Sequence, residues 1–280
     1  VWTLHDCWSF TGHCAYFDYA RCDRWQTECH HCPQLKTYPI CYGPDGSRRN
    51  YRLKKKLFTS LPSLTLTPPC HWLADTLRRS FLSQYPVRVI ENGVDLSVFH
   101  PTESDLRKRY QLGAPYIVLA VAAEWTERKG LRYLLACARR LPCDYQLVVL
   151  GLTDAQIAQL PQGVLGLPKT ASAHELAAWY TLASVVANPT MEDNMPLVNL
   201  EALACGTPVA VFRTGGCPEA VDDTCGRVVE QGDADGLREA VMALAPRKKE
   251  LEQQCLARAK RFDSRDCYQK YCALYREVRR

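Results

Sequence analysis

The chain has 280 residues, of which 47% are hydrophobic and 23% are charged. These proportions are typical of a globular protein large enough for two domains of medium size. The formal net charge of +5 excludes a strongly basic nucleic-acid-binding protein, although it suits anionic phosphates or an acidic membrane face. No apolar run approaches the length of a transmembrane helix, and we find no signal peptide. Because the sequence opens on Val1 inside an apolar run, we expect it to lack its natural N-terminus.

The first part of the chain predicts a small α/β unit. We expect strands at residues 1–4, 64–67 and 87–90, a loop at 33–50, and a helix near 73–84. His5 follows the first strand, at an edge where site residues collect. Asn92-Gly93 marks a turn, and we place a domain boundary near residue 95.

Fifteen cysteines are scattered along the chain. An odd number of cysteines, several of them in apolar runs, is typical of a reducing compartment, so we expect a cytoplasmic protein. Four lie close together in the segment GHCAYFDYARCDRWQTECHHCP, which ends in a C-x-x-C pair. Thiolates at such spacing can bind zinc in a closed structural site, and reduced thiols or disulfides are the alternatives. The candidate zinc ligands are Cys14, Cys22, Cys29 and Cys32.

A basic run follows the cysteines. Its residues are Arg48, Arg49, Arg52, Lys54, Lys55 and Lys56. One interpretation is the solvated face of a helix. The other is contact with an anionic membrane or with a phosphate-bearing acceptor, which clusters of this size support.

From about residue 116 the chain repeats strand-then-helix units, which predicts a doubly wound parallel sheet. We expect strands at 116–122, 146–150, 164–167, 184–187, Val209–Phe212 and Gly226–Val229. We expect helices after residue 130, at 174–181, after 196, from about 234, from 248 and over 262–280.

The stretch NPTMEDNMPLVNLEALACGTPVAVFRTGGCPE, which begins at Asn188, predicts a ligand site at the carboxyl edge of this sheet. Pro196 suits the first turn of a helix, and the N-terminus of a helix suits phosphate. Asp193 and Glu201 bracket that turn, and carboxylates accept hydrogen bonds from sugar hydroxyls. An ordinary strand–loop–helix unit with an acidic loop is the alternative interpretation.

The motifs NPT-EDN-P-NLEALACGTPV and TGG-PE resemble the E-x7-E region of retaining family 4 glycosyltransferases. HDCWSFTGHC near the start is similar to the matching part of the subgroup that builds bacterial capsules, exopolysaccharides and lipopolysaccharides. The resemblance implies the GT-B fold, with two Rossmann-like doubly wound parallel-sheet domains, of which the first is here incomplete. It implies domains at 1–94 and 95–261, with a last helix at 262–280 that crosses back to the first.

The resemblance also implies roles for individual residues. The first acid of the motif, which contacts the transferred sugar, falls on Asp193, with Glu192 one residue away; the second acid, Glu201, binds the ribose. Lys129 would stabilise the leaving diphosphate, and His5 would lie near the reaction centre. Glu124 stands where the family has an arginine, so Arg128 is the candidate for a second cation. The remaining donor-binding candidates are Asn194, Met195, Pro196 and Leu197.

The implied activity is sugar transfer, with retention of configuration, from a UDP- or GDP-linked donor to a polysaccharide or lipid-linked acceptor. This activity requires no catalytic metal, and we expect no nucleic-acid partner. A catalytically inactive nucleotide-sugar-binding fragment and an epimerase of similar fold are the competing hypotheses.

Overall fold

The structure, a computed structural model, describes residues 1–279. The chain divides into two compact units. The first unit contains Val1–Asn92, the loop Glu192–Met195 and the chain from Cys267 onward, and the second contains Gly93–Met191 and Pro196–Asp266. Within residues 1–279, every helix is too short or too polar to cross a membrane.

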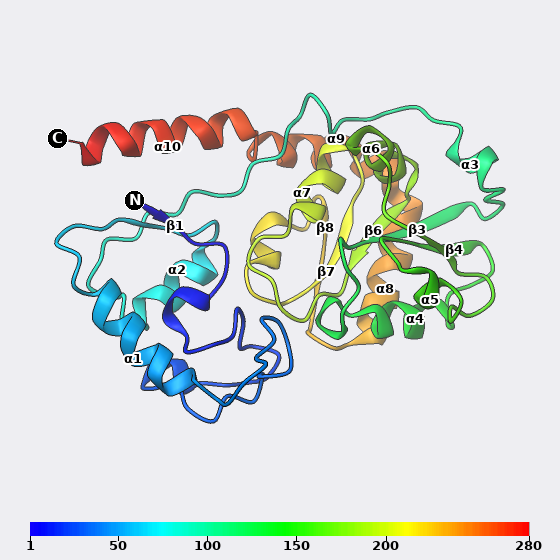
Figure 1. The fold of residues 1–280 in the computed structure, drawn as a ribbon. Helices are drawn as coiled ribbons and strands as arrows, with labels where there is room; N and C mark the ends of the chain where they lie inside the picture. The colour runs from blue at the N-terminus through cyan, green and yellow to red at the C-terminus, as the bar shows by residue number, and fades with distance from the viewer. Residues whose placement is uncertain (280) are drawn as a thin grey trace. The chain divides into compact units, whose positions relative to one another are not determined.

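The second unit is built on a six-stranded parallel sheet with the order β5-β4-β3-β6-β7-β8 (Figure 1). Its strands are β3 (Tyr116–Val121), β4 (Tyr145–Leu150), β5 (Leu165–Leu167), β6 (Val185–Asn188), β7 (Val209–Phe212) and β8 (Gly226–Val229). The sequences YIVLAV in β3 and VAVF in β7 are almost wholly apolar, because a parallel sheet is covered on both faces. The predicted doubly wound sheet is confirmed.

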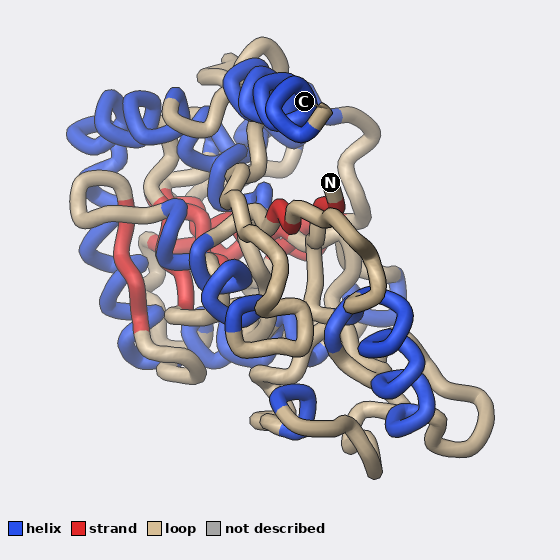
Figure 2. The backbone as a smooth tube through the Cα atoms, turned by 90° about the vertical axis from the view of Figure 1, so that its left-hand side faces the viewer, coloured by secondary structure: helices blue, strands red, loops and turns tan. Residues whose placement is uncertain are grey.

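Helices cover both faces of this sheet (Figures 1 and 2). The helix α8 contacts α4, β6, β7 and β8 on one face, whereas α7 contacts α6, α9, β6 and β7 on the other. The helices are α3 (Leu106–Arg109), α4 (Leu131–Ala138), α5 (Asp154–Ile157), α6 (Ala173–Leu182), α7 (Leu197–Ala204), α8 (Ala234–Leu244) and α9 (Lys248–Lys260). Short 3₁₀ turns are η3 (Glu127–Lys129), η4 (Cys217–Ala220) and η5 (Ala245–Arg247).

The first unit contains two parallel strands, β1 (Trp2–Thr3) and β2 (Leu66–Thr67). Its helices are α1 (Ser47–Phe58) and α2 (His71–Arg78), with 3₁₀ turns η1 (Trp8–Phe10) and η2 (Arg24–Gln26). The last helix, α10 (Ser264–Val278), belongs to this unit from Cys267 onward. There Glu277 pairs with Arg88 at 2.9 Å, and Lys270 pairs with Glu91 at 3.4 Å.

Several predicted elements of the first unit differ in extent from the structure. The strands expected at 1–4 and 64–67 are shorter, and the loop expected at 33–50 ends where α1 begins, at Ser47. Residues 87–90 lie beside β2 but form no strand, because Pro68 and Pro69 donate no N–H groups and end the ladder there. The helix expected near 73–84 is α2, which ends at Arg78. Just beyond it the Ser80 hydroxyl accepts the Leu82 N–H at 3.1 Å, a local bond that competes with continuation of the helix.

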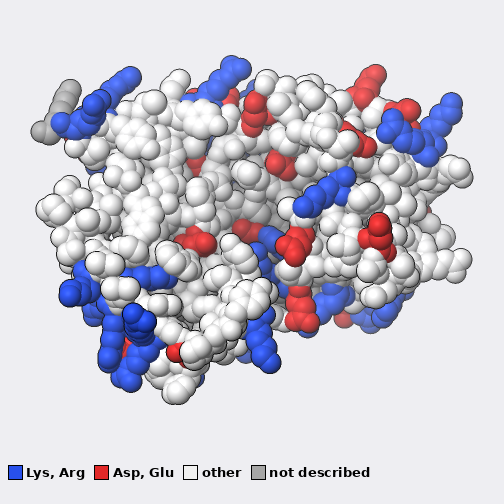
Figure 3. Space-filling view, viewed as in Figure 1, with Lys and Arg blue, Asp and Glu red and all other residues white. Residues whose placement is uncertain are grey.

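The basic run forms α1, and Lys and Arg side chains gather over this helix (Figure 3). Arg48, Arg49, Arg52, Lys55 and Lys56 are exposed, which agrees with a solvated helix face. Lys54 is the exception. Its ammonium group is buried and donates to the carbonyl oxygens of Trp8 at 2.6 Å and Thr11 at 3.0 Å.

The start of α6 gives a test of how the second unit is stabilised. Ser172 caps this helix by accepting the Glu175 N–H at 3.1 Å. We predict that Ser172→Ala lowers the free energy of unfolding by about 0.5–2 kcal/mol, because the N–H loses its partner, whereas Ser172→Asp keeps the stability. Urea denaturation of both variants and the parent measures the effect. Equal stability of the alanine and aspartate variants would show that the cap contributes nothing.

Candidate functional site

The strand order of the second unit places its candidate site. β3 and β6 lie side by side at the centre of the sheet, and the order of the strands reverses between them. In a doubly wound sheet the loops that follow two such strands diverge to opposite faces, and ligands bind in the crevice at the carboxyl ends of the strands. The predicted site residues around Lys129 and Pro196 follow these two strands.

The loop after β3 is firmly fixed. The Trp125 indole N–H donates to the carbonyl oxygen of Leu150 at the end of β4, at 2.8 Å. The chain then forms η3, whose last two residues, Arg128 and Lys129, are half-buried. Two cationic side chains therefore lie between the end of β3 and the start of α4.

This loop is hydrogen-bonded to the loop after β6. The Arg128 carbonyl oxygen accepts the Met191 N–H at 2.7 Å and the Thr190 hydroxyl at 3.4 Å. Gly130 makes the close approach possible: its φ is +78°, and a Cβ atom there would lie 2.0 Å from the Pro189 carbonyl oxygen. Any side chain at position 130 would push the two loops apart.

The loops after β7 and β8 reach the same edge. The Gln231 side-chain amide donates to the Met191 carbonyl oxygen at 2.9 Å and to the Thr214 hydroxyl at 3.4 Å. Thr214 follows β7, and Gln231 follows β8. The carboxyl edge is therefore one hydrogen-bonded set of loops, and Gln231 is a member that the sequence pattern did not suggest.

The helix α7 begins just after this set of loops. Pro196 is its N-cap residue, with φ −67° and ψ 127°, so it lies one position before the first turn in which it was predicted. The structure gives α7 no side-chain cap. The first N–H groups of a helix have no partner within the helix and favour an anion. Leu197, the first helical residue, is 45% exposed.

Glu201 lies on the second turn of α7 and is held by a tyrosine. The Tyr180 hydroxyl of α6 donates to Glu201 Oε2 at 2.8 Å. Burial raises the pKa of Glu201, and the hydrogen bond from Tyr180 opposes that rise. The pKa of Tyr180 is raised by burial and by the Glu201 charge. Tyr180 escaped the sequence analysis because an aromatic residue in an apolar helix reads as core.

The loop Glu192–Met195 belongs to the first unit. Glu192 is 4% exposed, and its Oε1 accepts the Tyr19 N–H at 2.8 Å. Asp193 accepts the N–H of the next residue at 3.0 Å. Both acids thus accept backbone N–H groups, and they differ in exposure: Glu192 is buried, whereas Asp193 is half-buried.

His5 is brought together with the same loop. The Asn194 side-chain amide donates to the His5 carbonyl oxygen, and the Tyr16 hydroxyl also donates to it, at 3.2 Å. The Asn92 amide donates to the Met195 carbonyl oxygen at 2.9 Å. The imidazole of His5 is exposed, so the backbone of this residue anchors the loop while its side chain faces outward.

The four candidate zinc ligands line one cavity in the first unit. In the present arrangement of residues 1–279, no group of three or more His, Cys, Asp or Glu side chains could hold a metal ion.

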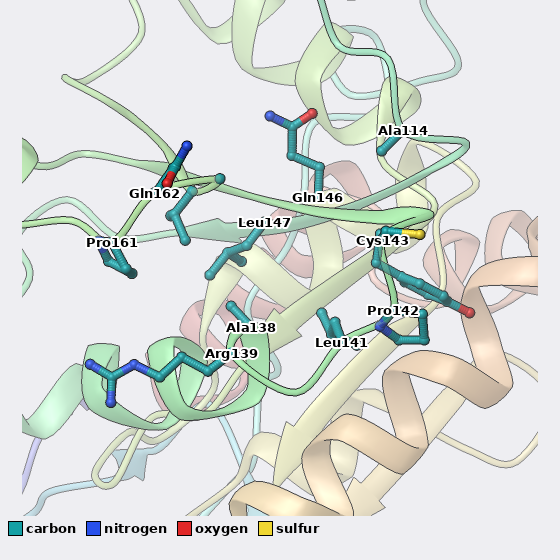
Figure 4. Close-up of a pocket in the computed structure, with 13 residues that line it drawn as sticks. Ala114, Ala138, Arg139, Leu141, Pro142, Cys143, Gln146, Leu147, Pro161 and Gln162 are labelled. Atoms are coloured by element: carbon teal, nitrogen blue, oxygen red, sulfur yellow. The ribbon is translucent and has the colours of Figure 1, made fainter.

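The second unit also contains a cavity of about 470 Å³ at the other end of the sheet (Figure 4). Tyr145 and Gln146, at the start of β4, line it together with Ala114 and Cys143. This is the amino edge of the sheet, where α/β folds do not place their active sites. None of the predicted site residues lines it.

Comparison with known proteins relates these features to a family. Residues 115–246 match the family described as Glycosyl transferases group 1. The chain is 31% identical over 212 residues to the MMP alpha-(1->4)-mannosyltransferase of Mycolicibacterium hassiacum, a match that covers 71% of this chain and 49% of that protein. It is 28% identical over 240 residues to the putative colanic acid biosynthesis glycosyl transferase WcaC of Escherichia coli, with coverage of 82% and 56%.

Solved structures show the fold. The sucrose-phosphate synthase from Thermosynechococcus elongatus superposes with a TM-score of 0.71 and 22% identity, over 89% of this chain and 66% of that one. Anabaena Alr3699/HepE, solved in complex with UDP, gives a TM-score of 0.70 and 19% identity, with coverage of 82% and 68%. The chain has the GT-B fold of these structures, and it spans about half the length of the curated relatives it matches.

The contact between Tyr180 and Glu201 gives a pH-dependent prediction. Because the folded pKa of Glu201 is raised, its stabilising contribution is full below the unfolded pKa and is lost as pH rises through the folded pKa. Tyr180→Phe removes the bond to the carboxylate and raises that pKa further. We expect it to lower the free energy of unfolding by about 1.5–3 kcal/mol at neutral pH, and by less in acid, where the carboxyl group is neutral.

Urea denaturation of the parent and of Tyr180→Phe, at neutral pH and in acid, measures how the loss of stability depends on pH. Tyr110→Phe is the matched control, because that ring packs on Trp179, the neighbour of Tyr180, with centroids 5.1 Å apart. A loss of stability from Tyr180→Phe that is the same at both pH values would contradict the assignment of an ionised Glu201.

Proposed function

We propose that this chain, whose residues 115–246 match the family described as Glycosyl transferases group 1, transfers a sugar from a nucleotide-diphosphate donor to a hydroxyl group of a polysaccharide or lipid-linked saccharide. The observation that carries the proposal is the hydrogen bond from Met191 to Arg128, which joins two loops where the strand order reverses. UDP-glucose bound to a solved structure of the same fold supports a nucleotide-sugar donor.

The diphosphate is assigned to the carboxyl edge of the second unit. Lys129 and Arg128 supply positive charge from the loop after β3. The N–H groups at the start of α7 supply hydrogen bonds from the far side of the same edge. Negative charge grows on the diphosphate as the sugar leaves, and preorganised cations stabilise it most when water is excluded.

The ribose is assigned to Glu201. Its carboxylate is half-buried and oriented by Tyr180, which leaves the remaining acceptor positions for two neighbouring hydroxyl groups. The transferred sugar is assigned to Asp193, because this residue is half-buried whereas Glu192 is only 4% exposed and anchors the loop through the Tyr19 N–H. Asn194, Met195 and Leu197 complete the donor contacts through the loop and the first helical turn.

The proposed chemistry retains the configuration at the anomeric carbon. The bond from that carbon to the diphosphate oxygen breaks while the acceptor oxygen bonds to the same face. The acceptor proton passes to the departing phosphate oxygen, so no protein nucleophile is needed. His5 is assigned to the neighbourhood of the reacting atoms. Charge stabilisation by Lys129 and Arg128 takes the part that a metal ion plays in other transferases, so the proposal requires no catalytic metal.

The acceptor is proposed to be an anionic or membrane-linked saccharide at the cytoplasmic face of a membrane. The support is the exposed basic face of α1 (Figure 3). Leu53 and Leu57 are 49% and 52% exposed on that helix. Cationic side chains beside exposed leucines suit the boundary of an anionic lipid layer.

Incubation with labelled UDP- and GDP-sugars and saccharide or lipid-linked acceptors tests the proposal. We expect transfer with retained configuration, and we expect Lys129→Met to lower kcat by about 10²–10³-fold, as the loss of one transition-state donor does elsewhere. Lys129→Arg should keep part of the rate. Lys108→Met, at an exposed position of α3, is the control for a lost surface charge.

Other outcomes identify the competing functions. Epimer formation without transfer would make the protein an epimerase, and tight nucleotide-sugar binding without turnover would make it an inactive binder. A Lys129→Met variant as active as the parent would remove the proposed role of this residue.

A further inference from the structure

The first unit contains a small cavity built from cysteines. Cys14, Cys22, Cys29 and Cys32 all line it, and its volume is about 10 Å³. Cys14 and Cys29 are only 6% and 8% exposed. A space of that size takes a single water-sized sphere. It therefore suits one ion and excludes an organic ligand.

The four thiols are neighbours in space although 18 positions separate the first from the last. The Cys32 side chain is the largest influence on the pKa of the Cys14 thiol, which it raises. Cys29 interacts electrostatically with both Cys22 and Cys32. Each of the four thiols is thus close enough to another of them to affect its pKa or to have its own pKa affected.

The wall of the cavity carries an unsatisfied donor or acceptor. His13 lines the cavity, and its Nε2 atom is buried with no hydrogen-bond partner among the described residues. An unpaired polar atom is unfavourable against apolar packing. The imidazole of His13 is therefore a further polar group beside the four thiols.

A backbone N–H group points at one of the sulfur atoms. The Gly12 N–H donates to Cys29 Sγ at 3.2 Å. Position 12 must be glycine for this, because a Cβ there would lie 2.7 Å from the Cys29 Cβ atom. N–H donors to sulfur stabilise thiolates and orient them, as outer contacts do around bound metals.

A buried cation lies beside the same thiols. Lys54 interacts electrostatically with Cys14 and Cys29, and its ammonium group is fixed by the Trp8 and Thr11 carbonyl oxygens. Four thiolates around a divalent cation leave two negative charges in excess. The positive charge of Lys54 offsets one of these two negative charges at a buried position that water does not screen.

The segment of chain around the cysteines contains little regular secondary structure. Between Leu4 and Gly46 the only regular elements are η1 and η2, each of three residues. Irregular segments longer than about 12–15 residues are uncommon in a compact unit unless something ties them together. A metal ion bound by four cysteines from this segment supplies such a tie.

We propose that Cys14, Cys22, Cys29 and Cys32 bind one structural zinc ion. Because no group of these side chains within residues 1–279 is arranged to hold a metal as it stands, binding requires the thiols to rotate toward the shared cavity. Each thiol gives up its proton to solvent as its sulfur binds zinc. The site is closed and takes no part in the proposed transfer.

Metal analysis of the full chain, purified without chelator from zinc-supplemented medium, tests this. We expect one zinc per chain, and a strong loss of zinc in Cys14→Ser and Cys32→Ser. Cys143→Ser and Cys272→Ser, at exposed positions, are the matched controls and should keep the zinc.

If the serine variants do not fold, cobalt substitution of the unmutated chain tests the proposal independently. We expect a thiolate-to-cobalt charge-transfer band with the intense visible bands of a tetrahedral site. Zinc well below one per chain, a cobalt spectrum without sulfur ligands, or a Cys14–Cys32 disulfide in the freshly isolated protein would overturn the proposal.

Discussion

The candidate site depends on one backbone hydrogen bond, from the Met191 N–H to the Arg128 carbonyl oxygen at 2.7 Å. It joins the loop after β3 to the loop after β6, where the strand order reverses. Gly130 permits it, because only a residue without a side chain leaves space for the Pro189 carbonyl oxygen. The same contact sets the position of Lys129 and of the chain that enters α7. Cations and helical N–H groups, from distant parts of the sequence, are thereby directed to one edge of the sheet.

The acidic loop shows how neighbouring residues take different roles. Glu192 is buried and accepts the Tyr19 N–H, which makes it an anchor of the loop, and Asp193 accepts the N–H of the next residue in the chain. Asn194 anchors the loop a second time through the His5 carbonyl oxygen. Aspartate is a shorter acid than glutamate, and at the position proposed to contact the sugar it lies in a loop anchored by these two hydrogen bonds. We infer that loop geometry, rather than side-chain length, sets the reach of Asp193.

Local pattern predicted the second unit well and the first unit less well. β7 and β8 have the predicted bounds, because apolar runs between glycine and proline have few alternatives in a buried parallel sheet. The segment 87–90 failed because its ladder ends at Pro68 and Pro69, which lie elsewhere in the sequence. Tyr180 and Gln231 were missed for a similar reason: their partners, Glu201 and Met191, are neighbours only after folding. The spacing of four cysteines likewise predicted a zinc site, but only the fold shows that the four side chains line one cavity.

The most direct test of the account is a crystal structure of the chain with a bound nucleoside diphosphate. The account predicts the terminal phosphate within hydrogen-bond distance of Lys129 and of the first N–H groups of α7, with the ribose hydroxyls on Glu201. Density for the nucleotide elsewhere, for example in the cavity at the amino edge of the sheet near Gln146, would contradict it.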